Sequence, residues 1–422
     1  MSKPAPAFSL AFFFGFTLAL VLALSSLNSK AMGLAWFLLV VAGGWVAMTR
    51  RHRLAPSVAV PWAMLWLMVA TLSLCLKAVG VFYWSDPWDE RHGELRLFFG
   101  ALAVYALLRF KPLDRSTLIL LAHSLTLSSA AGLVWVLIFG RWDVASHPIP
   151  WAGAMAMGSS LLLALSLKSD FSLGQRRTWL AGGLLALMAV MASQSRGAFG
   201  IVFWWFAVGL HHAWHIWASK HSAPNPTSSK TRRLAWVAAA LIGFLALSQT
   251  PVLERPAQSL QDAVNEIRVS SQSTTQGANS SVGARLYMWQ NSLTAIEASP
   301  WVGHGREGRI ALLREWADAA QSDVVKQLGH VHNEYLHQMV DHGLWGLSSQ
   351  LVVLAGLLFI CWQLFQRRCT VAAFSLAGIV FVHMTACMSN VNFAHNYYTA
   401  SFSLFVSLSL WLSLLEPTEI EC

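Results

Sequence analysis

Apolar segments long enough to cross a lipid bilayer recur along most of this 422-residue chain. A hydrocarbon layer of roughly 30 Å takes about 20 helical residues to cross, and only helices and closed barrels satisfy their backbone hydrogen bonds in lipid. Charged residues make up 12% of the chain, against about 25% in soluble domains. The sequence therefore predicts an all-α membrane protein of about twelve spans. The predicted spans are 8–28, 31–48, 57–76, 94–110, 116–139, 150–168, 178–195, 198–218, 234–250, 341–365, 370–388 and 396–415.

The distribution of Lys and Arg predicts how this bundle is oriented. Sixteen of the 29 cations lie in short loops on the side of the N-terminus, six lie in the opposite short loops, and seven lie in the long loop 251–340. Because cytoplasmic loops carry the excess of Lys and Arg, both termini are expected in the cytoplasm and the long loop on the outer side. Contact of the cytoplasmic loops with anionic headgroups also accounts for the net charge of +9, so no nucleic-acid partner is predicted.

The chain is expected to consist of three parts. Residues 1–250 hold nine spans, 251–340 form an outer loop domain, and 341–422 hold three spans and a cytoplasmic tail. Long loops inside a compact chain are usually functional or disordered. Apolar residues at near-helical spacing predict two amphipathic helices in this loop, at 283–297 and 309–320, lying on the outer membrane face.

The segment H-V-H-N-E-Y-L-H-Q-M-V-D-H-G-L-W-G-L, residues 330–347, contains four of the fifteen histidines. The ordinary pKa of histidine lies near neutral pH, so a cluster at a membrane surface suggests proton transfer. A helix from about residue 330 would place four side chains in one stripe. Glu334 could then hydrogen-bond His337 and orient it as a general base. The stripe consists of His330, Glu334, His337 and Asp341.

A plainer interpretation of this segment is that its histidines only cap a helix or reach toward the lipid headgroups. Asn333 would then be an ordinary N-cap residue. The helical phase also places His332 on the opposite face from His337. Gln338 and His330 are further candidates for contact with a substrate.

Two arginines at the outer membrane edge are candidate anion-binding residues. Arg196 stands in S-Q-S-R-G-A-F-G (193–200), a tight turn predicted between the seventh and eighth spans. A charge beside hydrocarbon normally has a partner or a ligand, although Arg196 could also be a simple interfacial anchor. Arg285 precedes the first loop helix, where main-chain N–H groups favour anions. Arg306, in the glycine-rich stretch 300–309, is a weaker candidate.

These residues fit one chemical account. Guanidinium groups bind phosphate through paired hydrogen bonds, so the arginines would hold a lipid-linked pyrophosphate and stabilise it as a leaving group without a cation. A histidine would accept the proton of an attacking hydroxyl. The acidic loop S-D-P-W-D-E-R-H-G-E (85–94) could bind a divalent cation, but it lacks an Asp-x-Asp pair. We interpret it as a solvated loop, so neither a metal nor another cofactor is predicted.

Three motifs resemble the O-antigen ligase/polymerase superfamily. They are S-R-G (195–197), G-A-R-L-Y-M-W-Q-N-S-L…S-P-W-V-G-H-G (283–305) and H-N-E-Y-L-H-Q-M-V-D-H-G-L-W-G-L (332–347). Their order matches the family, as does a twelve-span layout with a large periplasmic loop before the last three spans. The resemblance covers residues 180–350 by motif and the rest of the chain by topology alone.

The resemblance implies a fold like that of the GT-C membrane glycosyltransferases, in the inner membrane of a Gram-negative bacterium. It implies an O-antigen ligase, which transfers O-antigen polysaccharide from undecaprenyl pyrophosphate to a sugar hydroxyl of lipid A–core by inverting, metal-independent chemistry in the periplasm. The family's two arginines fall on Arg196 and Arg285. Its histidine falls on His332, with the glycine eleven residues later on Gly343. The motif thus favours His332 as the base, whereas the helical phase favours His337, and both stay candidates.

Other activities stay open at this point. In the polymerases of this superfamily the acceptor is a second undecaprenyl-linked repeat, and in a third branch, whose members tend to be longer, it is a protein side chain. Ligases often carry a Thr-Thr pair beyond the glycine, where this chain has Gly346 and Leu347; this difference weakens the ligase against the polymerase. A transporter of lipid or polysaccharide would carry ionisable residues at the bilayer midplane, whereas this chain gathers its charges at the outer face.

Overall fold

The computed structural model describes residues 10–49, 60–110, 115–221 and 278–415, with four single positions between 261 and 268. These residues form helices and loops and include no β-strand, which confirms the all-α prediction. The α-helices are α1 (Leu10–Ala23), α2 (Ser29–Thr49), α3 (Val60–Trp84), α4 (His92–Phe110), α5 (Arg115–Phe139), α6 (Pro148–Leu167), α7 (Leu173–Ala192), α8 (Gly200–His221), α12 (Ser281–Ala298), α13 (Gly305–Ala320), α14 (Asp323–Lys326), α15 (Glu334–Gln366), α16 (Thr370–Cys387) and α17 (Asn396–Leu412).

The chain is a multi-pass membrane protein. Eleven of the twelve predicted spans fall on described helices, and the remaining one, 234–250, lies outside the described residues. Six of these helices are long and apolar enough to cross a membrane; they are α2, α3, α5, α6, α15 and α16. The count of twelve spans and their orientation stay predictions.

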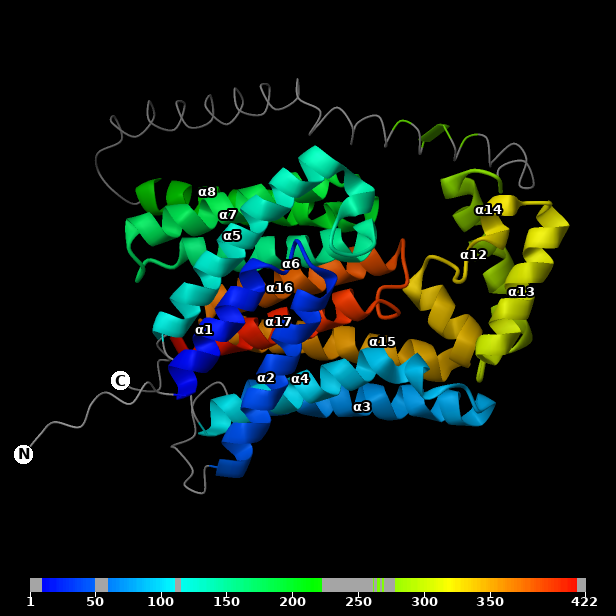
Figure 1. The fold of residues 1–422 in the computed structure, drawn as a ribbon, viewed down its shortest axis with the longest axis horizontal. Coiled ribbons are helices and arrows are strands. Elements are labelled where there is room, and N and C mark those ends of the chain that lie inside the picture. The colour runs from blue at the N-terminus through cyan, green and yellow to red at the C-terminus, as the bar shows by residue number, and fades with distance from the viewer. Residues whose placement is uncertain are drawn as a thin grey trace, which may run out of the picture.

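Helices α6 and α17 lie at the centre of the bundle (Figure 1). Every residue of α6 except Leu167, and every residue of α17 except Asn396, is buried. A helix that is apolar on all sides is suited to this central position. Gly153 of α6 allows close packing, because a Cβ atom there would lie 2.5 Å from the ring of Tyr398 of α17. The two helices therefore form a fixed frame for the loops at their ends.

Helices α12, α13 and α14 gather at one end of the bundle (Figure 1). Helices α12 and α13 confirm the two helices predicted at 283–297 and 309–320, although both begin earlier than expected. Their apolar faces pack on one another, around Met288, Leu313 and Trp316. Their position relative to the membrane surface stays a prediction.

Helix α15 bends close to these three helices. His342 and Gly343 leave the helical conformation, so Glu334–Asp341 forms a short first segment before the long apolar one. The loop between α12 and α13 holds this bend by two backbone hydrogen bonds: the N–H of His304 donates to the carbonyl of Val340 (2.8 Å), and the N–H of Leu344 donates to the carbonyl of Pro300 (2.9 Å).

The connections predicted on the outer side meet at this same end. Asp86, after α3, accepts a hydrogen bond from the backbone of Arg306 in α13. The rings of His147, before α6, and His395, before α17, stack at 6.0 Å. These contacts bring segments that are far apart in the sequence to one polar region.

Candidate active site

The polar region begins with the N-terminus of α15. The side chain of Asn333 accepts hydrogen bonds from the N–H groups of Tyr335 (3.0 Å) and Leu336 (3.1 Å), so α15 begins at Glu334. The interpretation of Asn333 as an N-cap is confirmed, and the expectation of a helix from residue 330 is wrong. His330 and His332 lie instead in the preceding loop, where His332 has a φ of +53°. Such a conformation is uncommon for a residue other than glycine and often marks a functional site.

Glu334 does not make the predicted hydrogen bond to His337. Its two oxygens accept hydrogen bonds from Gln338 Nε2 (3.0 Å) and from the backbone N–H of Phe393 (3.0 Å). A backbone donor from the loop between α16 and α17 therefore draws this carboxylate away from the imidazole. The side chain that faces His337 is Asp341, with 3.3 Å between His337 Nε2 and Asp341 Oδ2.

Asp341 is also the partner of a buried arginine, Arg309, which was not among the predicted site residues. Arg309 Nε donates to Asp341 Oδ1 at 2.6 Å, and the same guanidinium donates to the carbonyl of Gly329. Arg309 lies inside α13. Its ion pair joins α13 to the first segment of α15.

Lys77 is a second buried cation that was not among the predicted site residues. It lies near the end of α3, is 2% exposed, and donates from Nζ to Gln338 Oε1 (2.6 Å). Its other partner is His342 Nδ1 (3.1 Å), which assigns the proton of a neutral His342 to Nε2. That nitrogen donates to Asp86 Oδ2 (2.9 Å). The predicted span ended at residue 76, so Lys77 was counted as a loop charge, although helix α3 continues past it.

The acidic loop 85–94 is tied to the start of α13. Asp86 accepts from the backbone N–H of Arg306 at 3.0 and 3.2 Å. The guanidinium of Arg306 lies 3.4 Å from Glu90 and 3.8 Å from Asp89. Burial raises the pKa of Asp86. Arg306, a predicted contact for substrate, is therefore paired with carboxylates. No group of three or more acidic, His or Cys side chains is placed to hold a metal ion among the residues described.

Five histidines form a contiguous cluster at this end of the bundle. The ring of His330 lies 4.2 Å from that of His332, 6.4 Å from that of His337 and 6.3 Å from that of His395, which stacks on His147. Burial lowers the pKa of His330 and of His395 to about 4, and that of His332 to about 2. These three imidazoles are therefore neutral at neutral pH and can accept a proton.

One of the two predicted arginines, Arg285, lies beside this cluster. After burial and the neighbouring His330, the charge of Arg285 lowers the pKa of His332. Arg285 also lowers the pKa of His147, after burial and Arg141. Arg285 lies inside α12, not before it as expected. Arg196 lies in the predicted turn, a short 3-10 helix over Arg196–Phe199.

Arg141 is a third arginine on this side and was not predicted. It begins the 3-10 helix Arg141–Asp143 between α5 and α6. Burial and the charge of Arg196 lower its pKa, so the two guanidinium groups lie close enough to repel each other. The Arg141 Nε is buried and has no hydrogen-bond partner among the described residues. Arg141 could have been predicted by the argument used for Arg196, because it too is a lone arginine at the end of an apolar span.

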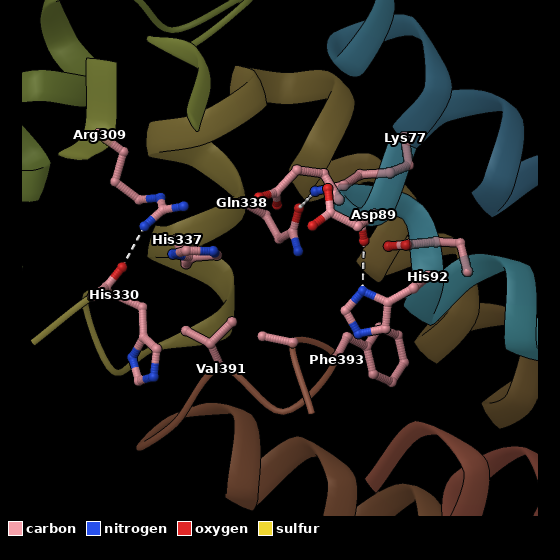
Figure 2. A pocket seen from close by; sticks show the side chains of 13 residues that line it. Lys77, Asp89, His92, Arg309, His330, His337, Gln338, Val391 and Phe393 are labelled. Carbon is pink, nitrogen blue, oxygen red and sulfur yellow. Dashed lines mark hydrogen bonds between the residues drawn. The ribbon is translucent and has the colours of Figure 1, made fainter. Parts of the chain in front are cut away.

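A cavity of about 220 Å³ lies beside the histidines (Figure 2). Figure 2 shows His330 and His337 along one side of it and Asp89 and His92 along the other. His330 both lines this cavity and contacts His332. The histidine cluster is therefore flanked by cationic arginines and by a polar cavity.

The fold and this site define a multi-pass helical membrane protein with a charged site at one end of the bundle. Residues 181–349 match the O-antigen ligase family. This segment contains Arg196, Arg285, Arg309 and the cluster residues His330, His332 and His337. This match confirms the resemblance to the superfamily over that segment.

Three similar proteins extend this finding. An uncharacterised protein of Haemophilus influenzae is 25% identical over 176 residues, which are 39% of this chain and 44% of that protein. The exopolysaccharide production protein ExoQ of Rhizobium meliloti is 25% identical over 316 residues, 70% of this chain and 64% of its own length. A general O-oligosaccharyltransferase of Acinetobacter baylyi is 28% identical over 233 residues, which are 53% of this chain and 36% of that protein. The matched segments cover less than two thirds of each relative.

Proposed function

We propose that this protein is an O-antigen ligase, which transfers O-antigen from undecaprenyl pyrophosphate to a sugar hydroxyl of lipid A–core on the periplasmic side of the inner membrane. The observation that carries this proposal is that arginines lie beside neutral histidines within the domain that matches the O-antigen ligase family. The exopolysaccharide and oligosaccharyltransferase relatives support glycan transfer as the general activity.

The arginines supply the binding site for the leaving group. Arg141, Arg196 and Arg285 contribute up to three positive charges where the pyrophosphate of the donor would lie. Guanidinium groups bind phosphate oxygens in pairs, and fixed cations stabilise the charge that develops as the glycosidic C–O bond breaks. Arginines held close together repel each other, so an anion between them would relieve that repulsion.

His332 is the general base in this proposal. Its neutral ring would take the proton from the acceptor hydroxyl as the hydroxyl oxygen bonds to the anomeric carbon and the pyrophosphate departs from the opposite face, which inverts the configuration. The Nδ1 of His332 is buried without a hydrogen-bond partner among the described residues. Bound pyrophosphate would offset the charge of Arg285, which lowers the pKa of His332 in the free protein. Donor binding would thereby make His332 a stronger base.

His337 is the second candidate for the base. Asp341 faces its Nε2, as a carboxylate faces the histidine in many acid–base pairs. However, Asp341 is already neutralised by Arg309. We therefore assign His337, with Glu334 and Gln338, to holding the first segment of α15 in place.

Purified protein with undecaprenyl-pyrophosphate-linked O-antigen and lipid A–core tests the proposed function. Transfer in the presence of EDTA is the expected result, and no transfer would contradict the enzyme assignment. Lipopolysaccharide from a deletion strain separates the ligase from the polymerase. Loss of all long-chain material with accumulation of lipid-linked polymer indicates a ligase, and core carrying a single repeat indicates a polymerase.

A further inference from the structure

The polar cavity beside the histidines carries chemistry that the pyrophosphate site does not use. Its lining comes from α3, α4, α13 and α15, from the 3-10 helix Trp88–Arg91, and from the loops before α15 and after α16. Its polar lining includes Lys77, His92, Glu94, His330, His337 and Gln338.

Three imidazole nitrogens of this lining have no protein partner. The Nε2 of His92 and the Nδ1 atoms of His330 and His337 are buried and make no hydrogen bond to the residues that the structure describes. Buried polar atoms are nearly always hydrogen-bonded, because leaving them unpaired costs free energy. These nitrogens would be satisfied by a ligand that carries several hydroxyl groups, or by water.

The charges of the cavity disfavour an anionic ligand. Its cations, Lys77 and Arg309, already have protein partners in Gln338, His342 and Asp341. The side formed by the start of α4 and the loop before it is acidic. That side carries Asp89, Glu90 and Glu94. Asp89 and Glu90 face Arg306 in turn, so neither cation of the described lining is left without a partner to hold a pyrophosphate. Carboxylates and imidazoles, by contrast, readily hydrogen-bond sugar hydroxyls.

The size and remaining lining of the cavity suit one sugar ring. Its volume of about 220 Å³ lies below the roughly 300–1,000 Å³ of pockets for drug-sized ligands. Val391, Phe393 and Ala394 give it an apolar side, and Figure 2 shows Val391 and Phe393 together below His337 and Gln338. That side can pack against the C–H groups of a sugar while the polar side binds its hydroxyls.

We propose that this cavity binds the sugar ring of the acceptor that presents the attacking hydroxyl, and that His92 and Glu94 hydrogen-bond its other hydroxyls. The inference rests on the proposed function. An inverting displacement requires the acceptor and the pyrophosphate on opposite faces of the anomeric carbon. The histidine cluster has Arg285 beside His332 and the cavity beside His330. This arrangement gives the pyrophosphate and the acceptor separate places next to the same cluster.

Steady-state kinetics of the full-length protein with two variants test this assignment. Glu94→Gln keeps the shape of a buried carboxyl group that accepts a hydrogen bond from Gln350 Nε2, and His92→Ala removes an imidazole at the first residue of α4. Glu315→Gln, at an exposed position of α13, is the matched control. Lipid A–core isolated from a deletion strain is varied at saturating lipid-linked donor, and the donor is then varied at saturating acceptor.

We expect the KM for lipid A–core to rise about tenfold or more in both variants, because each loses a hydrogen bond to the acceptor. The KM for the donor and the control variant should stay unchanged. A rise in the donor KM to the same extent would assign the cavity to the donor, and an unchanged acceptor KM would show that it holds only water; either result overturns the inference. Absence of transfer by the wild-type protein would instead contradict the proposed function.

Discussion

Gly303 and Gly343 meet at the bend of α15, and each has a backbone conformation that side chains rarely allow. Their φ angles are +66° and +57°. A Cβ atom on Gly303 would lie 2.7 Å from the backbone nitrogen of Gly343, and a Cβ atom on Gly343 would lie 2.5 Å from the nitrogen of Val302. The loop before α13 and the bend of α15 can therefore approach this closely only while both positions are glycine.

Gly343→Ala should lower the unfolding temperature and abolish transfer. The backbone conformation of Gly343, with φ +57° and ψ −144°, costs about 1–3 kcal/mol for a residue with a side chain. The overlap with backbone atoms adds to that cost because the backbone cannot move aside. Gly44→Ala is the matched control, since nothing lies within 4 Å of a Cβ atom there. Thermal unfolding in detergent and a transfer assay measure both effects. Wild-type stability for Gly343→Ala would show that the bend tolerates a side chain.

The sequence predicted the helices well because the length of an apolar segment is a local property. Eleven of the twelve expected spans and the two loop helices coincide with described helices, and Asn333 caps a helix as its side chain predicts. The start of α15 was misplaced because the histidine stripe suggested that the helix began at residue 330. Because Asn333 is the N-cap, the helix begins at Glu334, and His330 and His332 lie outside it.

The candidate site was predicted only in part, because its contacts join segments far apart in the chain. Arg285 and His332 were identified, and the structure places them close enough for the charge of one to affect the other. Lys77 and Arg309 were missed as site residues, because their partners lie 261 and 32 residues away. A single sequence contains no signal for such pairings, and only the packing of α3 and α13 on α15 reveals them.

Arg285→Ala should reduce transfer by about 10²–10³-fold, the usual effect of removing one fixed donor from a developing negative charge. Arg285→Lys should restore little of this activity, because an ammonium group cannot form the paired hydrogen bonds of a guanidinium. Arg314→Ala, at an exposed position of the neighbouring helix α13, is the control for a lost positive charge. Initial rates with the purified proteins measure the effect. Transfer near the wild-type rate in Arg285→Ala would remove this residue from the pyrophosphate site.

Arg309 and Asp341 should be more costly to lose singly than together. Breaking a buried ion pair from one side leaves an uncompensated charge and typically costs about 3–5 kcal/mol. Asp341→Asn and Arg309→Gln should each destabilise the protein strongly, whereas the double variant should be more stable than the sum of the two effects implies. Unfolding of all four proteins forms a double-mutant cycle. Strict additivity would mean that the 2.6 Å contact contributes no coupling.

His332→Ala should reduce transfer by about 10²–10⁴-fold, the contribution typical of a general base. His337→Ala should mainly lower stability, since His337 is buried against Asp341. The pKa of about 2 keeps His332 neutral in the free protein, so kcat/KM should show no loss near pH 6.5 due to this residue. Rates from pH 5.5 to 8 for wild type and both variants check these outcomes. A larger loss in His337→Ala, with the protein folded, would reassign the base.

Acidification should destabilise the protein below about pH 6.5. Burial lowers the pKa of His330 and of His395 from the ordinary 6.5 to about 4, so the unfolded chain binds more protons than the folded protein between these values. The free energy of unfolding therefore rises with pH across this window, and the contribution of these two histidines reaches its full value above pH 6.5. Thermal unfolding in detergent at pH 7.5, 6.5 and 5.5 should show a falling midpoint. The double variant His330→Gln, His395→Gln should show a shallower fall, because two of the groups that bind protons on unfolding are gone. An equal fall in the variant would mean that other groups set the pH dependence, and that these two imidazoles are not held neutral by burial.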